Sequence, residues 1–320
     1  MRKVGLIGLI LLLCFGMSVF ARGASETTER VRFATGGSAG VYFAFGSAAA
    51  GVLQERTGIT ITVQSTGASR ANILLIDQGE VEMALVQNDV MDYAYRGVNL
   101  FQSDGRLTSF STMAGIYPET CQIIASPGSG IRTVADLRGK NVSVGDAGSG
   151  VEFNASQILE AYGLTFNDIT KQNLSFAASA DALRDGRIDA FFATSGTPTP
   201  AIIDLAMTRD IVVVEVGGDN VARLIQQYPF YSQVTIPAGT YRGQTAAVQT
   251  VGVKATFIVS NRLSEETVYQ LTRGLFQYQP QIAVAHFRGN DITPRNAVDG
   301  ISVPFHPGAA RYLREIGALR

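Results

Sequence analysis

The chain has 320 residues, of which 46% are hydrophobic and 17% are charged, and its formal net charge is −1. A chain of this length can bury the cores of two ordinary domains, and the near-neutral charge gives no indication of a nucleic-acid-binding surface. It has two cysteines and two histidines, and because no acid–cysteine set stands near the histidines at metal-ligand spacing, we expect neither a metal nor a cofactor.

The first 23 residues are typical of a secretory signal peptide. Basic residues at positions 2 and 3 precede an apolar run over residues 4–20, and small residues follow, so we expect cleavage after Ala21 or Gly23. No later stretch is both long and apolar enough to cross a bilayer. The sequence therefore predicts an exported protein with a periplasmic or otherwise extracytoplasmic location. Cleavage removes three of the 26 basic residues and none of the 27 acids, which leaves a net charge of −4.

Two other interpretations of the N-terminus stay open. The segment could remain as an uncleaved anchor, or Cys14 could carry a lipid, although Leu13 before it fits a lipid-attachment site poorly. After cleavage the chain keeps one cysteine, Cys121, so we expect no internal disulfide. Cys121 leads an apolar run and is expected to be buried.

Strands and helices alternate along the first part of the chain. Periodicity and turn residues predict strands over residues 31–35, 59–63 and 83–86, with helices over residues 39–56 and from residue 67 to Gly79. Gly58 and Gly79 stand where these helices are expected to end. This βαβαβ order predicts a parallel sheet with right-handed crossovers.

The second part repeats this alternation and ends in helices. We expect strands over residues 120–125, 141–144, 188–192, 211–216 and 248–259, and helices over residues 131–139, 151–162, 179–185, 201–207, from 264 onward and 308–316. The sequence predicts an α/β fold of two lobes, each a mixed sheet flanked by helices. Lobe 1 would comprise residues 31–117 and 245–320, and lobe 2 with its crossover residues 118–244. Two crossings between lobes form a hinge.

Two stretches 110 positions apart carry the same pattern. Residues 33–43 and 143–153 each read as a strand, a turn rich in glycine and serine, and a helix, and residues 77–85 and 184–192 repeat a helix end followed by a buried strand. A repeat of this length indicates two similar lobes. Each lobe would aim a helix N-terminus at a shared ligand cleft.

The two turns supply the first candidate ligand-binding residues. Backbone N–H groups at a helix start carry a partial positive charge that favours an anion. Glycines let the backbone approach a ligand closely. On this basis the candidates are Gly37 and Ser38 in the first turn, and Gly148, Ser149 and Gly150 in the second. The alternative is that these residues are ordinary helix caps.

Further candidates follow the buried strands, where ligands lie in open α/β sheets. Gln87 and Asn88 follow one strand, and Ser195 and Thr197 occupy the matching positions in the repeat. Tyr42, one turn into the first helix, is expected either to line the cleft or to belong to the core. For the strand-end residues the alternative is an ordinary turn.

The sequence gives little support to an enzyme. Residues 148–150 lack the spacing of the hydrolase nucleophile elbow, and residues 36–40 lack the lysine of a phosphate-binding loop. Both histidines stand near the C-terminal end, at positions 286 and 306, with no partner set nearby. We therefore expect a binding protein without catalytic residues.

Several motifs in order resemble one known family. They are the Gly-Gly-Ser-Ala-Gly-Val-Tyr turn at 36–42, Tyr-Pro-Glu at 117–119, residues 129–140, Gly-Ser-Gly at 148–150, residues 185–192, Gly-Thr-Pro-Thr-Pro at 196–200, Tyr-Pro-Phe-Tyr at 228–231, residues 236–241 and 306–312. Over essentially the whole mature chain, this pattern resembles the TAXI family of extracytoplasmic solute receptors of TRAP transporters. One departure is Asp146, where the family more often has a neutral residue.

The resemblance implies a fold, a ligand class and a partner. The fold would be that of a two-lobed periplasmic binding protein, type II-like, with the ligand in the interlobe cleft. The ligand would be a small carboxylate, glutamate-like or a dicarboxylate, delivered to a sodium-coupled TRAP membrane subunit, fused or paired. We expect a monomer. Alternatives are a binding protein of an ABC importer and a ligand-binding protein of a sensor receptor, since function lies in the site and the partner.

Overall fold

The computed structural model describes residues 30–320. The predicted signal peptide, its cleavage positions Ala21 and Gly23, and Cys14 lie outside the described residues. No helix within residues 30–320 is long and apolar enough to span a membrane.

One mixed sheet of ten strands runs through the molecule, in the order β2-β1-β3-β10-β4-β7-β5-β6, with β8 paired to β4 and β9 to β10. The strands are β1 (Arg30–Ala34), β2 (Thr60–Gln64), β3 (Met83–Gln87), β4 (Phe110–Ala125), β5 (Asn141–Ser143), β6 (Thr170–Gln172), β7 (Ala190–Ser195), β8 (Val212–Val214), β9 (Ser232–Ile236) and β10 (Val248–Ser260). The pairs β1–β2, β1–β3, β5–β6 and β5–β7 are parallel, as the βαβ pattern predicts.

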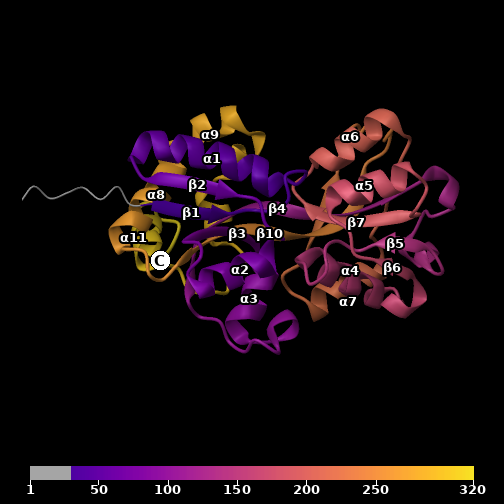
Figure 1. The fold of residues 1–320 in the computed structure, drawn as a ribbon, viewed down its shortest axis with the longest axis horizontal. Helices are drawn as coiled ribbons and strands as arrows, with labels where there is room; N and C mark the ends of the chain where they lie inside the picture. The colour runs from indigo at the N-terminus through magenta and orange to yellow at the C-terminus, as the bar shows by residue number, and fades with distance from the viewer. Residues whose placement is uncertain (1–29) are drawn as a thin grey trace, which may run out of the picture.

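Helices flank both halves of this sheet (Figure 1). One half carries α1 (Val41–Thr57), α2 (Ser69–Gln78), α3 (Asn88–Arg96), α8 (Glu265–Gln277), α9 (Gln279–Ala285), α10 (Pro294–Val298) and α11 (Pro307–Glu315). The other carries α4 (Gly150–Ala161), α5 (Phe176–Arg184), α6 (Pro200–Thr208) and α7 (Asp219–Gln227). Short 3-10 helices, η1 (Asn99–Phe101), η2 (Pro127–Ser129), η3 (Val134–Leu137), η4 (Phe166–Asp168) and η5 (Phe287–Asp291), fill the connections.

The predicted helix ends at Gly58 and Gly79 are confirmed. Both residues have left-handed backbone angles, with φ of 74° and 76°, and their N–H groups bond back to the last turn of α1 and α2. A residue with a Cβ adopts this conformation at a cost, so glycine fixes where each helix stops and where the next buried strand starts.

Two long strands, β4 and β10, run through both halves of the sheet (Figure 1). The first part of β4 pairs with β10, as Gly115 does with Thr256, and its second part pairs with β7, as Thr120 does with Ser195. Likewise β10 pairs first with β9 and then with β3. The expected strand at residues 120–125 was therefore too short: β4 begins ten residues earlier and continues through Pro118, next to a register shift that accommodates the missing N–H.

Separate hydrophobic cores define two lobes. One core combines early and late parts of the chain, including Phe33, Phe45 and Phe257. Another lies between β4 and the middle of the chain, including Ile123 and Phe192. The fold is a two-lobed mixed α/β architecture, as predicted, with the lobes joined through continuous strands.

Candidate functional site

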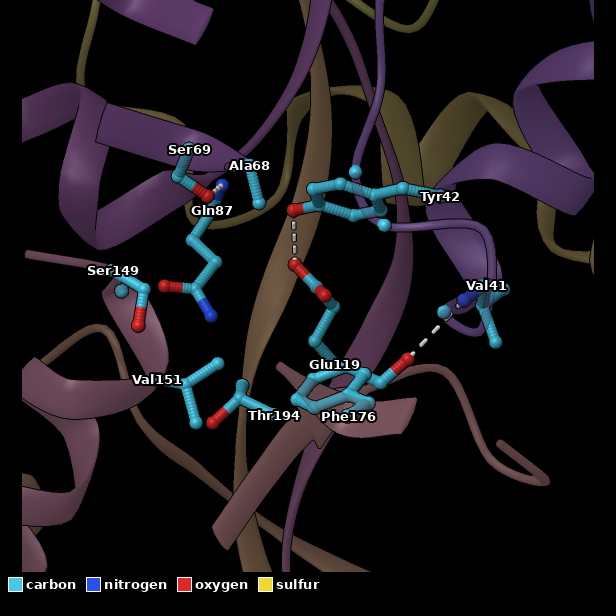
Figure 2. A pocket seen from close by; sticks show the side chains of 15 residues that line it. Val41, Tyr42, Ala68, Ser69, Gln87, Glu119, Ser149, Val151, Phe176 and Thr194 are labelled. Carbon is cyan, nitrogen blue, oxygen red and sulfur yellow. Dashed lines mark hydrogen bonds between the residues drawn. The ribbon is translucent and has the colours of Figure 1, made fainter. Parts of the chain in front are cut away.

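A cavity of about 50 Å³ lies between the two lobes, within about 410 Å³ of empty space that includes the solvent at its mouth. We call it the inner cavity. Its lining comes from both lobes and from β4 where that strand passes between them: Gly36, Gly37, Gly40, Val41, Tyr42, Ala68, Ser69, Gln87, Glu119, Ser149, Gly150, Val151, Phe176, Thr194 and Ser195. Figure 2 shows these side chains converging from different elements on one space.

A second hollow of about 220 Å³ adjoins the inner cavity through shared lining residues. We call it the outer hollow. It shares Gly37, Gly40, Ala68, Ser149, Val151 and Phe176 with the inner cavity and adds the residues Ser38, Ala39, Ser65, Thr66, Gly67, Asp146, Ser175 and Ala177. Because the two hollows share these lining residues, a ligand could reach the inner cavity through the outer hollow.

Four helices begin in the lining of the inner cavity. The N-cap residues of α1, α2, α3 and α4 are Gly40, Ala68, Gln87 and Ser149, and all four are lining residues. Neither Gly40 nor Ala68 makes a side-chain cap bond, and the first turns of α1 and α2 have no acidic residue. Apart from the Val41 N–H, which lies 3.5 Å from the Ser195 hydroxyl, no side-chain hydrogen bond from a described residue reaches the N–H groups of these two turns, and the helix dipoles favour negative charge in the cavity.

The start of α2 has an unusual backbone. Ala68 has φ of 65° and ψ of −146°, in a region that residues with a Cβ rarely adopt. Its N–H donates to the Thr66 hydroxyl at 3.1 Å, and the buried Asn72 amide donates to the carbonyls of Thr35 and Leu85 at 2.6 and 2.7 Å. These bonds tie the loop to β1 and β3. Such strain is found most often at functional sites.

The start of α4 is capped by its own side chains. The Ser149 hydroxyl accepts the N–H of Glu152 at 3.1 Å, and the Glu152 carboxylate accepts the N–H of Gly148 at 2.6 Å. Lys171 pairs with the other Glu152 oxygen at 2.6 Å, and these bonds hold the pKa of Glu152 below its usual value against the effect of its partial burial. The turn is thus fixed before any ligand arrives.

A buried carboxyl group occupies the centre of the lining. Glu119 on β4 is 2% exposed, and the Tyr42 hydroxyl donates to its Oε2. Figure 2 shows the Glu119 carboxyl directly facing the Tyr42 hydroxyl, between Gln87 and Val41. Burial raises the pKa of Glu119 to about 8, with Tyr42 and Arg288 acting in the opposite sense and Asp89 in the same sense. Burial also raises the pKa of Tyr42 well above its usual value, so this phenol stays a neutral donor.

A buried hydrogen-bond network connects the lobes beside the cavity. Asn154 of α4 accepts from the Gln87 amide at 3.2 Å and donates to Asp89 at 3.0 Å and to the Tyr231 hydroxyl at 2.8 Å. Tyr231 in turn donates to Gln157 at 2.6 Å. Burial raises the pKa of Asp89 to about 6. These bonds hold α4 of one lobe against β3 and α3 of the other.

Further bonds between the lobes lie on the opposite side of the cavity. The Ala201 N–H donates to the Ala39 carbonyl at 3.2 Å, and the Val41 N–H points to the Ser195 hydroxyl at 3.5 Å. Arg288 donates to the Thr197 carbonyl. With bonds on both sides, the structure has its cleft closed.

Six of the ten candidate residues from the sequence lie in the inner cavity: Gly37, Tyr42, Gln87, Ser149, Gly150 and Ser195. Ser38 lies in the outer hollow. Asn88, Gly148 and Thr197 are in the lining of neither hollow. A binding role for any of the ten stays a prediction.

The three residues outside the lining have structural bonds. Asn88 begins α3, where its side chain donates to the Gly300 carbonyl at 3.2 Å and accepts the Lys254 N–H at 2.9 Å. Gly148 has φ of 73° and is held by Glu152. Thr197 precedes a cis proline and gives its carbonyl to Arg288.

Sequence reasoning missed Glu119, Ser69, Phe176 and Thr194, all of which line the inner cavity. Glu119 had a signal, since it ends the Tyr-Pro-Glu motif at residues 117–119. An acid inside an otherwise apolar strand is either paired or functional. The other three have no distinguishing pattern, since serine, threonine and phenylalanine are common at such positions.

Metal ligation is not indicated by the geometry. Within residues 30–320, no three or more His, Cys, Asp or Glu side chains gather in a way that could hold an ion.

The chain belongs to the NMT1-like family, whose model matches residues 33–317. Solved structures share the fold at low sequence identity. The alkanesulfonate-binding protein SsuA from Xanthomonas axonopodis pv. citri, bound to MOPS, is 17% identical, with a TM-score of 0.51 over 91% of this chain and 80% of that one. A putative L-cystine ABC transporter protein from Listeria monocytogenes is 12% identical, with a TM-score of 0.52 over 86% and 100%. The substrate-binding protein of an amino acid ABC transporter is 10% identical, with a TM-score of 0.50 over 80% and 96%.

These likenesses establish the fold of this chain as that of two-lobed periplasmic binding proteins.

Proposed function

We propose that this protein is an extracytoplasmic solute-binding receptor, without enzymatic activity, that captures a small carboxylate and delivers it to a membrane transporter. One observation carries the proposal: the inner cavity is enclosed by both lobes and receives the starts of α1, α2 and α4. Backbone N–H groups at helix starts bind carboxylates without any basic side chain. The carboxylate would be glutamate-like or a dicarboxylate.

Two types of membrane transporter are candidates for the partner of this receptor. The sequence motifs resemble TAXI receptors and favour a sodium-coupled TRAP membrane subunit. Two of the similar structures come from ABC transport systems, which favours an ABC importer. Co-purification of the mature protein with each type of membrane subunit encoded near its gene distinguishes them, because the receptor binds its own transporter and not the other.

Ligand release requires the lobes to separate, and we place the hinge where β4 and β10 cross between them. Lobe 1 would comprise residues 31–117 and 245–320, with lobe 2 and the crossover at residues 118–244. The strands β4 and β10 are antiparallel neighbours, and two adjacent connections allow the lobes to bend about one axis while they stay aligned. The bonds of Asn154 and Arg288 across the cleft would break on opening.

Ligand-induced stabilisation tests the function. Mature protein, unfolded and refolded to remove bound solute, is titrated with glutamate, glutamine, 2-oxoglutarate and C4 dicarboxylates. A ligand that binds only the folded state stabilises it and so raises the melting temperature. At a free ligand concentration of 100 times the dissociation constant, the free energy of unfolding rises by about 2.7 kcal/mol. Small-angle scattering on the same samples should show a smaller radius of gyration with ligand. If none of these acids changes either quantity, the proposed ligand class is wrong.

A further inference from the structure

We propose that Glu119 receives the ammonium group of the ligand, so that the solute is a zwitterionic amino acid and not a dicarboxylate or a 2-oxo acid. This inference rests on the proposed function and narrows its ligand class. It is carried by the position of Glu119, by the charges around the ligand space and by the division of donors and acceptors in the lining.

The described residues that line the ligand space include acidic side chains and no basic ones. Among the described residues, Glu119 lines the inner cavity, Asp146 lines the outer hollow, and neither hollow has an arginine, lysine or histidine in its lining. A ligand with two carboxylates would bring two more negative charges beside these acids without a compensating side chain. A ligand with one ammonium and one or two carboxylates has a partner for each charge.

Glu119 has a free acceptor facing the ligand space. Its Oε2 accepts from Tyr42, and no hydrogen bond from a described residue reaches Oε1. The residue is 2% exposed and lies in the cavity lining. A buried carboxyl with half of its acceptor capacity unused, aimed into a cavity, is a site for a donor on the ligand.

The lining also offers a partner for each charge of such a ligand. The N-termini of α1 and α2, which have no side-chain cap of their own, offer N–H donors for a carboxylate. Glu119 lies on β4, with its carboxyl between the side of the cavity formed by Gln87 and Ser149 and the side formed by Val41 (Figure 2). Donors for an anion and an acceptor for a cation therefore share one enclosed space, as an amino acid requires.

The charged and titratable groups near Glu119 come from four elements. Tyr42 lies on α1, Tyr117 on β4, Asp89 on α3 and Arg288 on η5. Arg288 makes contacts outside the cavity: it pairs with Asp291 at 3.1 Å, donates to the Thr197 carbonyl and lies 5.2 Å from the Tyr117 ring centre, while its Nε is buried without a hydrogen-bond partner among the described residues. It is not in the lining of the inner cavity, so it neither fixes a ligand carboxylate nor replaces the ammonium as partner of Glu119.

An ammonium beside Glu119 changes its protonation. Burial raises the pKa of Glu119 to about 8 in the empty site, so the group is mainly protonated at neutral pH. A bound ammonium favours the carboxylate and lowers this pKa. Binding therefore releases a proton at pH values between the lowered pKa of the bound site and about 8, and over that range affinity rises with pH by up to tenfold per unit.

Calorimetric titration with a matched ligand pair tests the inference. Glutamate and 2-oxoglutarate share their carboxylates and differ in the ammonium. We expect glutamate to bind the wild-type protein at least 10-fold more tightly than 2-oxoglutarate. Glu119→Gln keeps an acceptor for Tyr42 and removes the charge, so it should weaken glutamate at least 10-fold and leave 2-oxoglutarate unchanged or improved. The control Asp204→Asn removes one exposed acid on α6 and should change neither affinity.

Proton release gives a second measurement that needs no variant. Glutamate titrations at about pH 6.5 in buffers of different ionisation enthalpy should show close to one proton released per ligand. Tighter binding of 2-oxoglutarate, retained glutamate affinity in Glu119→Gln, or an absence of proton release overturns the inference. In the first two cases the proposed receptor function stands, whereas binding of no acid at all would contradict that function itself.

Discussion

The two glycine-rich turns that repeat in the sequence have different bonds in the structure. The first turn, at residues 36–40, starts α1 at Gly40 without a side-chain cap, and a Cβ at Gly37 would meet nothing within 4 Å. The second, at residues 145–150, starts α4 at Ser149, which caps its own helix. A Cβ at Gly150 would come within 1.9 Å of the Gln87 side chain in the other lobe.

The different bonds indicate that the two turns have different roles, although their sequence patterns are alike. Under the proposed function, the first turn offers the ligand the N–H groups of α1 that no side chain caps. The second is fixed by Ser149 and Glu152, and under the proposed function it is the surface on which lobe 1 closes. Equal sequence spacing indicates a similar backbone shape. The neighbouring side chains then determine which turn has N–H donors available for a ligand and which turn contacts the other lobe.

The largest effect should come from closing the space at Gly150. Gly150→Val places a branched side chain in space that the other lobe already fills, because the Gln87 Oε1, its Cδ and Val90 would lie 1.9, 2.7 and 3.1 Å from the new Cβ. Gln87 cannot move aside without losing its bond to Asn154. We expect affinity to fall about 100-fold or more, near 3 kcal/mol, with the cleft held open in small-angle scattering at saturating ligand.

The matched control for this change is Gly51→Val. Gly51 is exposed within α1, and a Cβ there would meet nothing within 4 Å. It should leave affinity and scattering unchanged. A closed, tightly binding Gly150→Val protein would contradict the role of the second turn as a closing surface.

A smaller effect is expected at the cap of the second turn. Ser149→Ala removes the acceptor of the Glu152 N–H, which costs about 1 kcal/mol of folding stability, and it also removes a hydroxyl from the cavity lining. Affinity should fall about 5- to 10-fold, in line with one lost hydrogen bond. Thermal denaturation and calorimetric titration measure the two effects separately.

Ser264→Ala is the matched control, because it removes a helix cap at a position away from the ligand space. Ser264 caps α8 through the Thr267 N–H at 3.1 Å, the same distance as in α4, and lies outside both hollows. It should lower stability by a similar amount and leave affinity intact. Equal affinity losses in the two variants would mean that Ser149 acts only through the fold.

The sequence was sufficient for the arrangement of the fold because its signals are local. Gly58 and Gly79 end helices wherever a left-handed residue is needed, and the βαβ order then imposes parallel pairing. The long strand β4 was only partly predicted, since Pro118 reads as a strand end when its pairing partner is unknown.

The cavity was less accessible to sequence reasoning because it depends on pairing across distant elements. Gln87 lines the cavity and Asn88, one residue on, bonds to Gly300 and Lys254 instead, because α3 begins there and turns the side chain away. Glu119 enters the site only because β4 passes between the lobes. No periodicity in the sequence marks either fact.

The smallest effect is expected at the start of α2, where a substitution at Ala68 tests whether an uncapped turn must be rigid. Ala68 precedes α2 with φ of 65° and, like Gly40, has no side-chain cap bond. Ala68→Gly removes the cost of placing a Cβ residue in that region, and although glycine gives the unfolded chain more freedom, we expect a net gain of about 1 kcal/mol in folding stability. The control Ala48→Gly, within α1, should instead lose about 1 kcal/mol. Urea denaturation measures both.

Because Thr66 and Asn72 hold this loop through their own bonds, affinity in Ala68→Gly should change less than about 3-fold. A larger loss would mean that the Cβ of Ala68 contacts the ligand directly, and a loss of stability equal to that of the control would mean that the backbone at residue 68 carries no strain.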